Sequence, residues 1–201
     1  MSPKAIASLQ SSLLSAIREF AEKYGNAAVH SMSVPLFEEL QRIDVSPRHH
    51  PSISALPEME QLLLPEAGSL FQALLDAAPV LSWQNSYSIK DGFGQEYLDR
   101  YAWCDIIGPH GIFVSNQYRI GFGYWQKGLF YPAHSHEPEE IYWVLGGGGR
   151  FSKSDEPAQY RGPGSVIHHH PFDWHSIDMT DNPMLVLFFW KGANLHRKSD
   201  F

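Results

Sequence analysis

Three histidines and one glutamate in the last third of the sequence have an order that suits metal binding. His134, His136 and Glu140 lie within FYPAHSHEPEEIYWVLGGGG, and His175 follows in PGSVIHHHPFDWHSI. Alternate side chains of a β-strand share one face, so a single strand would aim the first three side chains the same way. Imidazole and carboxylate groups bind first-row divalent metals with little selectivity among them. The pattern therefore predicts one divalent transition metal, with zinc, iron and manganese as candidates, and with coordination positions left open for a substrate.

Two tyrosines flank this pattern. Tyr142 follows Glu140 by two residues and shares its strand face, and Tyr131 precedes the histidine pair. A divalent cation favours the phenolate form, so it lowers the pKa of a nearby tyrosine from its ordinary value of about 10. Either tyrosine is therefore a candidate base, and Tyr142 is also a candidate metal ligand. The alternative for both is a buried core tyrosine with a satisfied hydroxyl group.

The spacing of these residues resembles the two sequence motifs of the cupin family. The first motif, G-x5-H-x-H-x3,4-E-x6-G, fits the segment from Gly128 to Gly146, with one residue fewer before the last glycine. The second motif, a P-x-G turn and a later histidine, fits Pro163-Gly164 and His175 without the usual intervening residue. The resemblance implies a double-stranded β-helix, or jelly-roll barrel, with the metal in its interior.

Within the cupins, the segments YPAHSHEPEEIYWVLGG, WHSI and LFFWKG resemble the dimethylsulfoniopropionate lyases of the DddQ branch. This resemblance implies cleavage of dimethylsulfoniopropionate to dimethyl sulfide and acrylate by β-elimination. A metal would bind the substrate carboxylate while a tyrosinate removes the neighbouring proton. Aromatic rings would hold the methylated sulfonium cation. The candidates for this aromatic wall are Trp190, which the resemblance favours, and Tyr131, Phe172 and Trp143.

Other functions are compatible with the same four ligands. A cupin Fe(II) dioxygenase would bind dioxygen at the open positions, and an isomerase acting on a small carboxylate is a further enzyme. A non-catalytic cupin binding module is the alternative from another class. Such modules usually lose metal ligands, whereas this sequence retains all four.

Composition favours a small-molecule partner. The chain has 201 residues, 43% of them hydrophobic, which is enough for a real core, and its formal net charge of -7 argues against a general nucleic-acid or anionic-membrane surface. No stretch has the apolar length of a membrane helix or the pattern of a signal peptide, and Cys104 has no partner for an internal disulfide. We expect a cytoplasmic protein, and the oligomeric state stays open.

The elements that must position the site divide the chain in two. Apolar residues at steps of three and four predict an amphipathic helix from Pro3 to Tyr24, with Ser2 as its N-cap. Further helices are expected at 34–43 and at 58–77, the second divided near Pro65 or Gly68. The expected strands are 82–88, 102–107, 112–124, 141–145, 150–152, 165–168, 174–178 and 184–190. Residues 1–78 should therefore form a helical extension that packs on a β-barrel formed by residues 79–201.

Not every histidine belongs to the predicted site. Neighbouring residues of a strand point to opposite faces, so His168, His169 and His170 cannot all reach one interior, and structural roles are expected for them. The remaining histidines have no motif around them and are expected at the surface: His30, His49, His50, His110 and His196.

Overall fold

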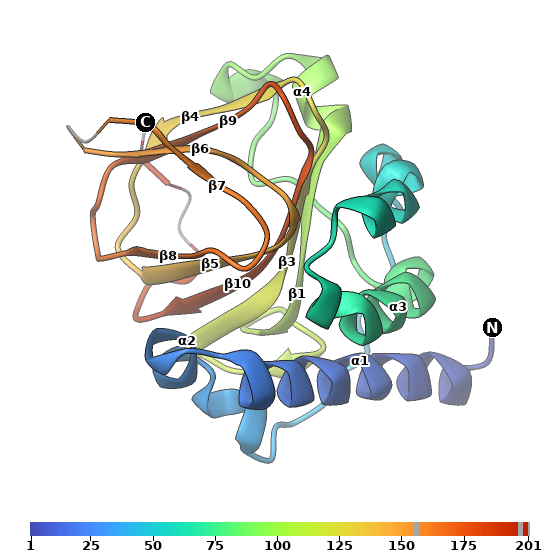
Figure 1. The fold of residues 1–201 in the computed structure, drawn as a ribbon. Helices are drawn as coiled ribbons and strands as arrows, with labels where there is room; N and C mark the ends of the chain where they lie inside the picture. The colour runs from blue at the N-terminus through green and yellow to red at the C-terminus, as the bar shows by residue number, and fades with distance from the viewer. Residues whose placement is uncertain (155–156, 197–198, 201) are drawn as a thin grey trace.

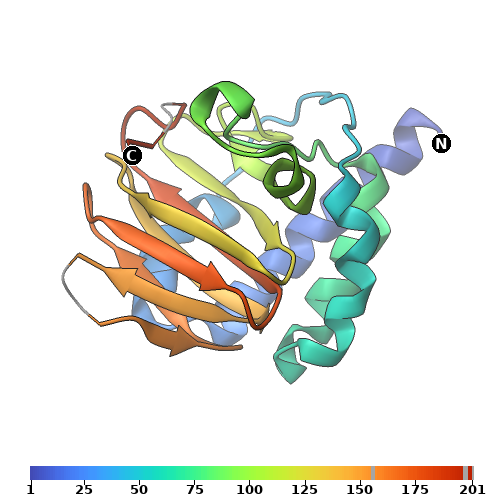
Figure 2. The ribbon, with the colours of Figure 1, turned by 90° about the horizontal axis from the view of Figure 1, so that it is seen from above.

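The computed structural model describes residues 1–154, 157–196 and 199–200. Its described part is a two-sheeted β-barrel with helices packed against one outer face, and the two chain termini lie on opposite sides of the molecule (Figure 1). The view from above shows the strands on one side and the long helices on the other (Figure 2). The mainly β barrel with a helical N-terminal extension, predicted from the sequence, is confirmed.

Helices fill most of the first hundred residues. The α-helices are α1 (Pro3–Tyr24), α2 (Ala27–Met32), α3 (Gly68–Ala77) and α4 (Gln95–Arg100). The 3-10 helices are η1 (Val34–Phe37), η2 (Pro51–Leu62), η3 (Pro65–Ala67), η4 (Ala78–Val80) and η5 (Ile89–Asp91). The bounds of α1 agree with the prediction, and the Ser2 hydroxyl accepts a hydrogen bond from the Ala5 N–H at 3.3 Å.

Two other helix predictions were wrong in their bounds. Of the expected helix 34–43 only the short turn η1 forms, while α2 lies before it, with the Asn26 side chain accepting a hydrogen bond from the Val29 N–H at 3.0 Å. In the expected helix 58–77, only the part from Gly68 onward is an α-helix. Proline removes a backbone donor and clashes with the preceding turn, so Pro57 and Pro65 favour short 3-10 segments there.

The larger sheet of the described chain has six strands. Their order is β2 (Phe113–Val114), β1 (Tyr101–Gly108), β3 (Tyr118–Trp125), β10 (Met184–Lys191), β5 (Glu139–Gly147) and β8 (Val166–His169). The smaller sheet has the order β4 (Leu129–His134), β9 (His175–Met179), β6 (Gly149–Lys153) and β7 (Gln159–Arg161). The expected strand 82–88 is absent from both described sheets and makes only isolated bridges, from Ser82 to Arg48 and from Gln84 to Trp103.

Hydrophobic clusters lie on both faces of the larger sheet. In β10, Leu185 and Leu187 pack toward the helices, whereas Val186 and Phe188 face the barrel interior. A strand that is buried on both faces consists of an almost continuous apolar run. This explains why the segment MLVLFFW lacks the alternation of a half-exposed strand.

The helical extension shares the outer cluster with the larger sheet. Leu13 and Ile17 of α1 and Leu74 of α3 are fully buried there, together with Cys104 of β1. Burial raises the pKa of the Cys104 thiol. Residues on both sides of position 78 belong to this one hydrophobic cluster. The predicted division of the chain into two parts at residue 78 therefore stays a prediction.

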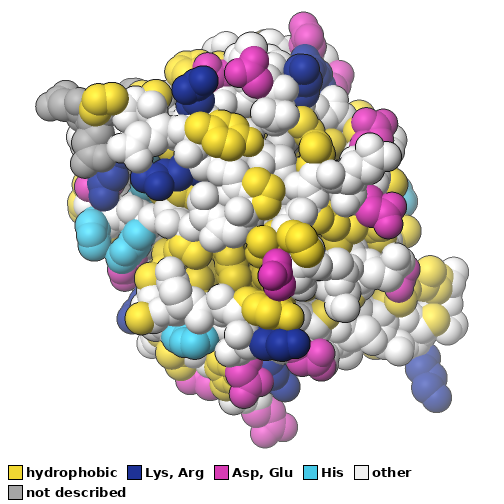
Figure 3. All heavy atoms as spheres, viewed as in Figure 1, with side chains coloured by type: hydrophobic (Ala, Val, Ile, Leu, Met, Phe, Trp, Pro, Cys, Tyr) yellow, Lys and Arg dark blue, Asp and Glu magenta, His cyan; other side chains and the backbone are white. Residues whose placement is uncertain are grey.

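Two observations bear on the predicted partners: the lengths of the described helices, and the distribution of charge on the face visible in Figure 3. No helix in the described part of the chain is both long and apolar enough to cross a bilayer. On the face shown in Figure 3, acidic and basic side chains are interspersed among apolar and uncharged ones. The predicted lack of nucleic-acid binding stays a prediction.

Candidate metal centre and adjoining cavity

The four predicted metal ligands converge between the two sheets. His134 ends β4 and is paired with His175 at the start of β9, so the smaller sheet supplies both imidazoles. Glu140 comes from β5 of the larger sheet, and His136 lies in the loop between β4 and β5. All four side chains are buried. One nitrogen from each of the three imidazoles lies within 4.8 Å of the others.

The prediction that one strand carries His134, His136 and Glu140 was wrong. β4 ends at His134 and β5 begins at Glu139, and the two strands belong to different sheets. Pro138 stands between them and has no N–H for a strand ladder, so the chain turns there. Tertiary packing of the two sheets therefore brings the side chains together, and only Glu140 and Tyr142 share a strand face as expected.

Backbone carbonyl groups fix the orientation of the three predicted imidazole ligands. In each ring, Nδ1 lies at hydrogen-bond distance from the carbonyl oxygen of a residue two positions away, at 2.8 Å for His134 and 2.9 Å for His136 and His175. Because a carbonyl only accepts, Nδ1 must carry the proton. Nε2 is then the basic nitrogen, and this tautomer with a fixed second nitrogen is typical of metal-binding histidines.

Glu140 lies at the middle of the cluster. Its Oε2 atom is 3.0 Å from Nδ1 of His169, 3.3 Å from Nε2 of His136 and 3.4 Å from Nε2 of His175. Its Oε1 atom accepts a hydrogen bond from the indole N–H of Trp190. Burial alone would raise the pKa of Glu140, but the attraction of His136 and the histidine hydrogen bonds outweigh burial and hold that pKa well below its ordinary value. The carboxylate is therefore anionic in the folded protein.

His169 belongs to this cluster, although the sequence analysis assigned it a structural role. The register of β5 and β8 places it opposite Glu140, and its ring stacks on His175 with centroids 3.8 Å apart. Burial lowers its pKa to about 4. Its Nε2 atom has no hydrogen-bond partner among the described residues. The register between two distant strands decides which of three consecutive histidines points inward, and no local pattern states that register.

The residues present fit a divalent transition metal. Burial, with the neighbouring His175 as a second cause, lowers the pKa of His134 to about 3, so this imidazole is neutral at physiological pH. Neutral imidazoles and an ionised carboxylate are the protonation states that a metal requires. At His136 burial is outweighed by the Glu140 carboxylate, which raises the pKa, so a bound metal would displace the extra proton there. The Nε2 atom of His175 is buried without a hydrogen-bond partner among the described residues and lies 3.4 Å from Glu140, which is also expected where a cation completes the cluster. Nitrogen and carboxylate donors leave zinc, iron and manganese as candidates.

Both predicted tyrosines adjoin the cluster. Tyr131 of β4 stacks on His134 with ring centroids 4.2 Å apart, and its hydroxyl oxygen is 2.7 Å from that of Tyr87. Tyr142 meets the ring of His169 edge-on at 5.8 Å. Burial raises the pKa of both phenols well above the ordinary value, and the Glu140 carboxylate raises that of Tyr142 further. Each phenol needs a cation to become an effective base near neutral pH.

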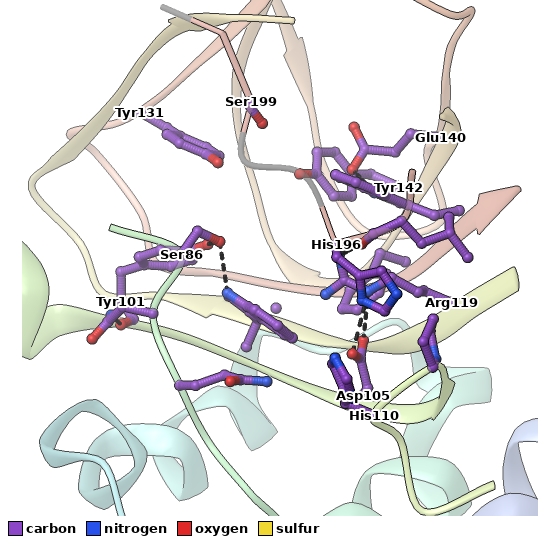
Figure 4. A pocket seen from close by; sticks show the side chains of 18 of the residues that line it. Ser86, Tyr101, Asp105, His110, Arg119, Tyr131, Glu140, Tyr142, His196 and Ser199 are labelled. Atoms are coloured by element: carbon purple, nitrogen blue, oxygen red, sulfur yellow. Dashed lines mark hydrogen bonds and ion pairs between the residues drawn. The ribbon is translucent and has the colours of Figure 1, made fainter. Parts of the chain in front are cut away.

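A cavity of about 320 Å³ opens beside the cluster. Figure 4 shows Tyr131 across the cavity from Glu140 and Tyr142, with Arg119 and Asp105 at the other end. Further described lining residues include Ser86, Tyr101, Trp103, Trp125, Phe188 and Trp190. The cavity is therefore lined by both aromatic and polar side chains, with Glu140 of the ligand cluster on one side and an ion pair on the other.

Arg119 and Asp105 form the charged end of the cavity, which sequence reasoning missed. Nε of Arg119 donates to both Asp105 oxygens, at 3.1 and 3.2 Å. The guanidinium carbon lies 4.5 Å from the ring centroid of Trp103 and 5.0 Å from that of Trp190. Arg119 is the one lysine or arginine among the described lining residues, and these contacts hold it in place.

Strand β3 contained a signal for this part of the cavity. In YRIGFGYW, Arg119 alternates with Gly121, Gly123 and Trp125 on one strand face. A Cβ atom at Gly123 would lie 2.7 Å from the ring of Trp125. An arginine and two glycines on the inward face of an apolar strand thus indicate a cavity, a pattern that the search for metal ligands did not use.

Two residues predicted for the aromatic wall lie elsewhere, which corrects the sequence analysis. Trp143 faces the helices, where its ring packs on Phe20 with centroids 4.4 Å apart. Residues 142 and 143 are neighbours in β5 and must point to opposite faces, so Trp143 cannot share the interior with Tyr142. Phe172 lies in the β8–β9 loop with a side chain that is 57% exposed. Trp190 and Tyr131 do line the cavity.

Comparison with known proteins identifies the family to which this chain belongs. The model of the dimethylsulfoniopropionate lyase family matches residues 24–186. The dimethylsulfoniopropionate lyase DddQ of Ruegeria pomeroyi is 27% identical over 176 residues, which covers 88% of this chain and 87% of that protein. Its crystal structure matches with a TM-score of 0.83 at 27% identity, covering 100% of this chain and 97% of that one.

A second solved structure agrees. A chain from the crystal structures of the dimethylsulfoniopropionate lyases RdDddP and RnDddQII matches with a TM-score of 0.87 at 28% identity and covers 98% of both chains. The family model spans most of the sequence, including β1 to β9 and the ligand cluster. This chain therefore belongs to the dimethylsulfoniopropionate lyase family.

Proposed function

We propose that this protein cleaves dimethylsulfoniopropionate to dimethyl sulfide and acrylate, in a metal-dependent β-elimination with a tyrosinate as the base. The observation that carries the proposal is the cavity in which two buried tyrosines adjoin a buried cluster of histidines and a glutamate. Membership of the lyase family and the names of the relatives support the choice of substrate.

The ligand cluster defines where the substrate carboxylate would bind. His134, His136, Glu140 and His175 would hold the metal, and Tyr142 adjoins them as a further candidate ligand. When bound, a divalent metal supplies Lewis acidity toward the substrate carboxylate, which makes the neighbouring carbon more acidic. The aromatic side chains at this end of the cavity, Tyr131, Tyr142 and Trp190, would limit the access of water, which would strengthen the electrostatic interactions there.

The elimination then needs one proton acceptor. A phenolate oxygen takes the proton from the carbon next to the carboxylate, the C–H electron pair forms the new double bond, and the C–S bond breaks. The sulfonium leaves as neutral dimethyl sulfide, so no oxidant or reductant is consumed. Tyr142 and Tyr131 are the two candidates for the base. The hydroxyl of Tyr87, 2.7 Å from that of Tyr131, would stabilise a phenolate at Tyr131 by hydrogen bonding.

The sulfonium end of the substrate is a methylated cation, for which an aromatic surface is the expected partner. Trp190 and Tyr131 provide such a surface within the cavity. The Trp190 ring is stacked on His136 with centroids 4.2 Å apart, and its N–H binds Glu140, so its position is tied to the ligand cluster. Substrate placement and metal placement would therefore depend on the same side chain.

The test is a headspace gas-chromatography assay for dimethyl sulfide with purified protein loaded with Zn²⁺, Fe²⁺ or Mn²⁺. We expect dimethyl sulfide and acrylate in equal amounts, no oxygen uptake, and loss of activity with a chelator. Glu140→Gln should lose metal and activity together, whereas Glu60→Gln, an exposed control, should behave as the parent protein. The assignment fails if the parent releases no dimethyl sulfide with any of these metals, and oxygen uptake in step with turnover would instead indicate a dioxygenase.

A further inference from the structure

A second group of histidine and carboxylate side chains lies on the other face of the β5–β8 strand pair. The register places Glu140 opposite His169, and both point into the barrel. Because neighbours along a strand alternate, Glu139 and His168 are turned to the outer face, and His170, just past the end of β8, lies beside them. Glu139 and His168 are about one third exposed, with side-chain values of 30% and 32%, and His170 is exposed. The three side chains are therefore open to ions from solvent.

The geometry of this outer group suits a single ion. Nε2 of His168 lies 2.7 Å from Oε1 of Glu139, and the rings of His168 and His170 have centroids 4.4 Å apart. One donor atom from each of the three residues lies within 4.8 Å of the other two. Donors bound at about 2.0–2.2 Å to one tetrahedral ion lie roughly 3.5 Å apart. Small side-chain rotations would close this difference, and exposed side chains can make them.

The backbone beneath the group is held in place. The N–H of His170 donates to Oδ2 of Asp173 at 2.7 Å, and the carbonyl of His170 accepts from the N–H of Asp173 at 3.0 Å. Lys153 pairs with the same Asp173 carboxylate at 2.7 Å and donates to the carbonyl of His168 at 3.4 Å. Groups that are already positioned lose less entropy when they bind a ligand. The two histidines thus present their rings from an ordered backbone.

We propose that Glu139, His168 and His170 form a second, surface site for a divalent transition metal, separate from the buried centre. Two imidazoles and a carboxylate are borderline donors that suit Zn²⁺ and Cu²⁺, and the exposed side of the site leaves positions for water. A simple ion pair between His168 and Glu139 accounts for two of the side chains. It does not account for His170, whose donor atom lies beside the same two groups. The proposal is independent of the reaction at the buried centre.

The experiment is a calorimetric Zn²⁺ titration of protein whose buried centre has been loaded beforehand and freed of excess metal. The parent protein should take up about one further Zn²⁺ per chain. His170→Ala and Glu139→Gln should weaken this uptake at least about 10-fold, the scale expected for loss of a metal contact. His49→Ala removes an exposed histidine outside both clusters and should leave the titration unchanged.

A spectroscopic readout separates the site from diffuse surface binding. Cu²⁺ added to the Zn²⁺-loaded parent should give an electron paramagnetic resonance spectrum with splitting from two imidazole nitrogens. His170→Ala and His168→Ala should each reduce this to one nitrogen, with melting temperatures close to that of the parent. Absence of further uptake in the parent, or equal uptake and equal spectra in the parent and in all cluster variants, would overturn the proposal.

Discussion

From residue 140 to residue 145, the two faces of β5 contact different parts of the protein. On the inner face, Glu140 and Tyr142 adjoin buried imidazoles and the cavity. On the outer face, Ile141, Trp143 and Leu145 pack against the helical extension in an apolar cluster. Both faces are buried between residues 140 and 145, so burial alone does not mark the site. Because neighbouring residues of β5 point to opposite faces, residues of the candidate site alternate with residues of the apolar core. Substitution of a residue on one face should therefore affect catalysis, and substitution of its neighbour should affect stability.

The largest expected effect lies on the outer face. Trp143→Ala should lower the free energy of unfolding by about 3–5 kcal/mol, because it leaves a cavity next to Phe20 in a well-packed core. Dimethyl sulfide release per folded molecule should stay close to that of the parent. Urea unfolding followed by circular dichroism measures the first quantity, and the headspace assay on the soluble fraction measures the second. A large loss of turnover in protein of unchanged stability would contradict the division between the faces.

The next effect lies in the barrel interior, at Tyr142 on the inner face of β5 or at Tyr131 of β4. Phenylalanine at the true base should lower kcat by about 10²-fold or more, equivalent to roughly 2.7 kcal/mol, while the aromatic packing is retained. Tyr142→Phe and Tyr131→Phe are the two variants to compare. The tyrosine that is not the base should mainly affect KM or metal affinity. Parent rates in both variants would exclude a tyrosinate base.

A smaller effect is expected from His169, which touches Glu140 from the neighbouring strand. His169→Phe removes the hydrogen bond to the Glu140 carboxylate and should weaken metal binding about 10–100-fold. His169→Asn is the matched variant, since its amide can donate from nearly the position of Nδ1 and should retain most of the affinity. Competition with a chromophoric chelator measures both. Equal affinities in the two variants would show that the hydrogen bond does not support the metal ligand.

The smallest effect is expected at the cavity wall. Trp190→Ala should raise KM by a factor equivalent to about 1–2 kcal/mol of lost cation–π contact. Trp190→Phe keeps an aromatic surface but loses the N–H that binds Glu140, so its KM should rise less while its metal affinity falls. Steady-state kinetics with metal in excess separate the two contributions. An unchanged KM in Trp190→Ala would remove this residue from the sulfonium site.

Sequence patterns predicted those features that depend on a short stretch of the chain. The helix from Pro3 to Tyr24 follows from its apolar spacing and its serine cap, and the identities of the four candidate ligands follow from the motif. Long-range register was not predictable in the same way, so His169 was missed and the ligands were placed on one strand. Trp143 is a different case. Trp143 follows Tyr142 directly, so the sequence alone indicates that the two side chains point to opposite faces of a strand. Trp143 was nevertheless assigned to the cavity wall because it is aromatic.

Because Cys104 is buried, the reactivity of its thiol depends on how often the structure around it opens. It is the single cysteine of the sequence, and its side chain is fully enclosed between β1 and the helices. A thiol reagent reaches such a group only when the helical extension separates from the sheet or the chain unfolds. The rate of Cys104 modification in the native protein would therefore measure the free energy of that separation, with no substitution introduced. Comparison with the global free energy of unfolding would show whether the extension opens alone or together with the barrel.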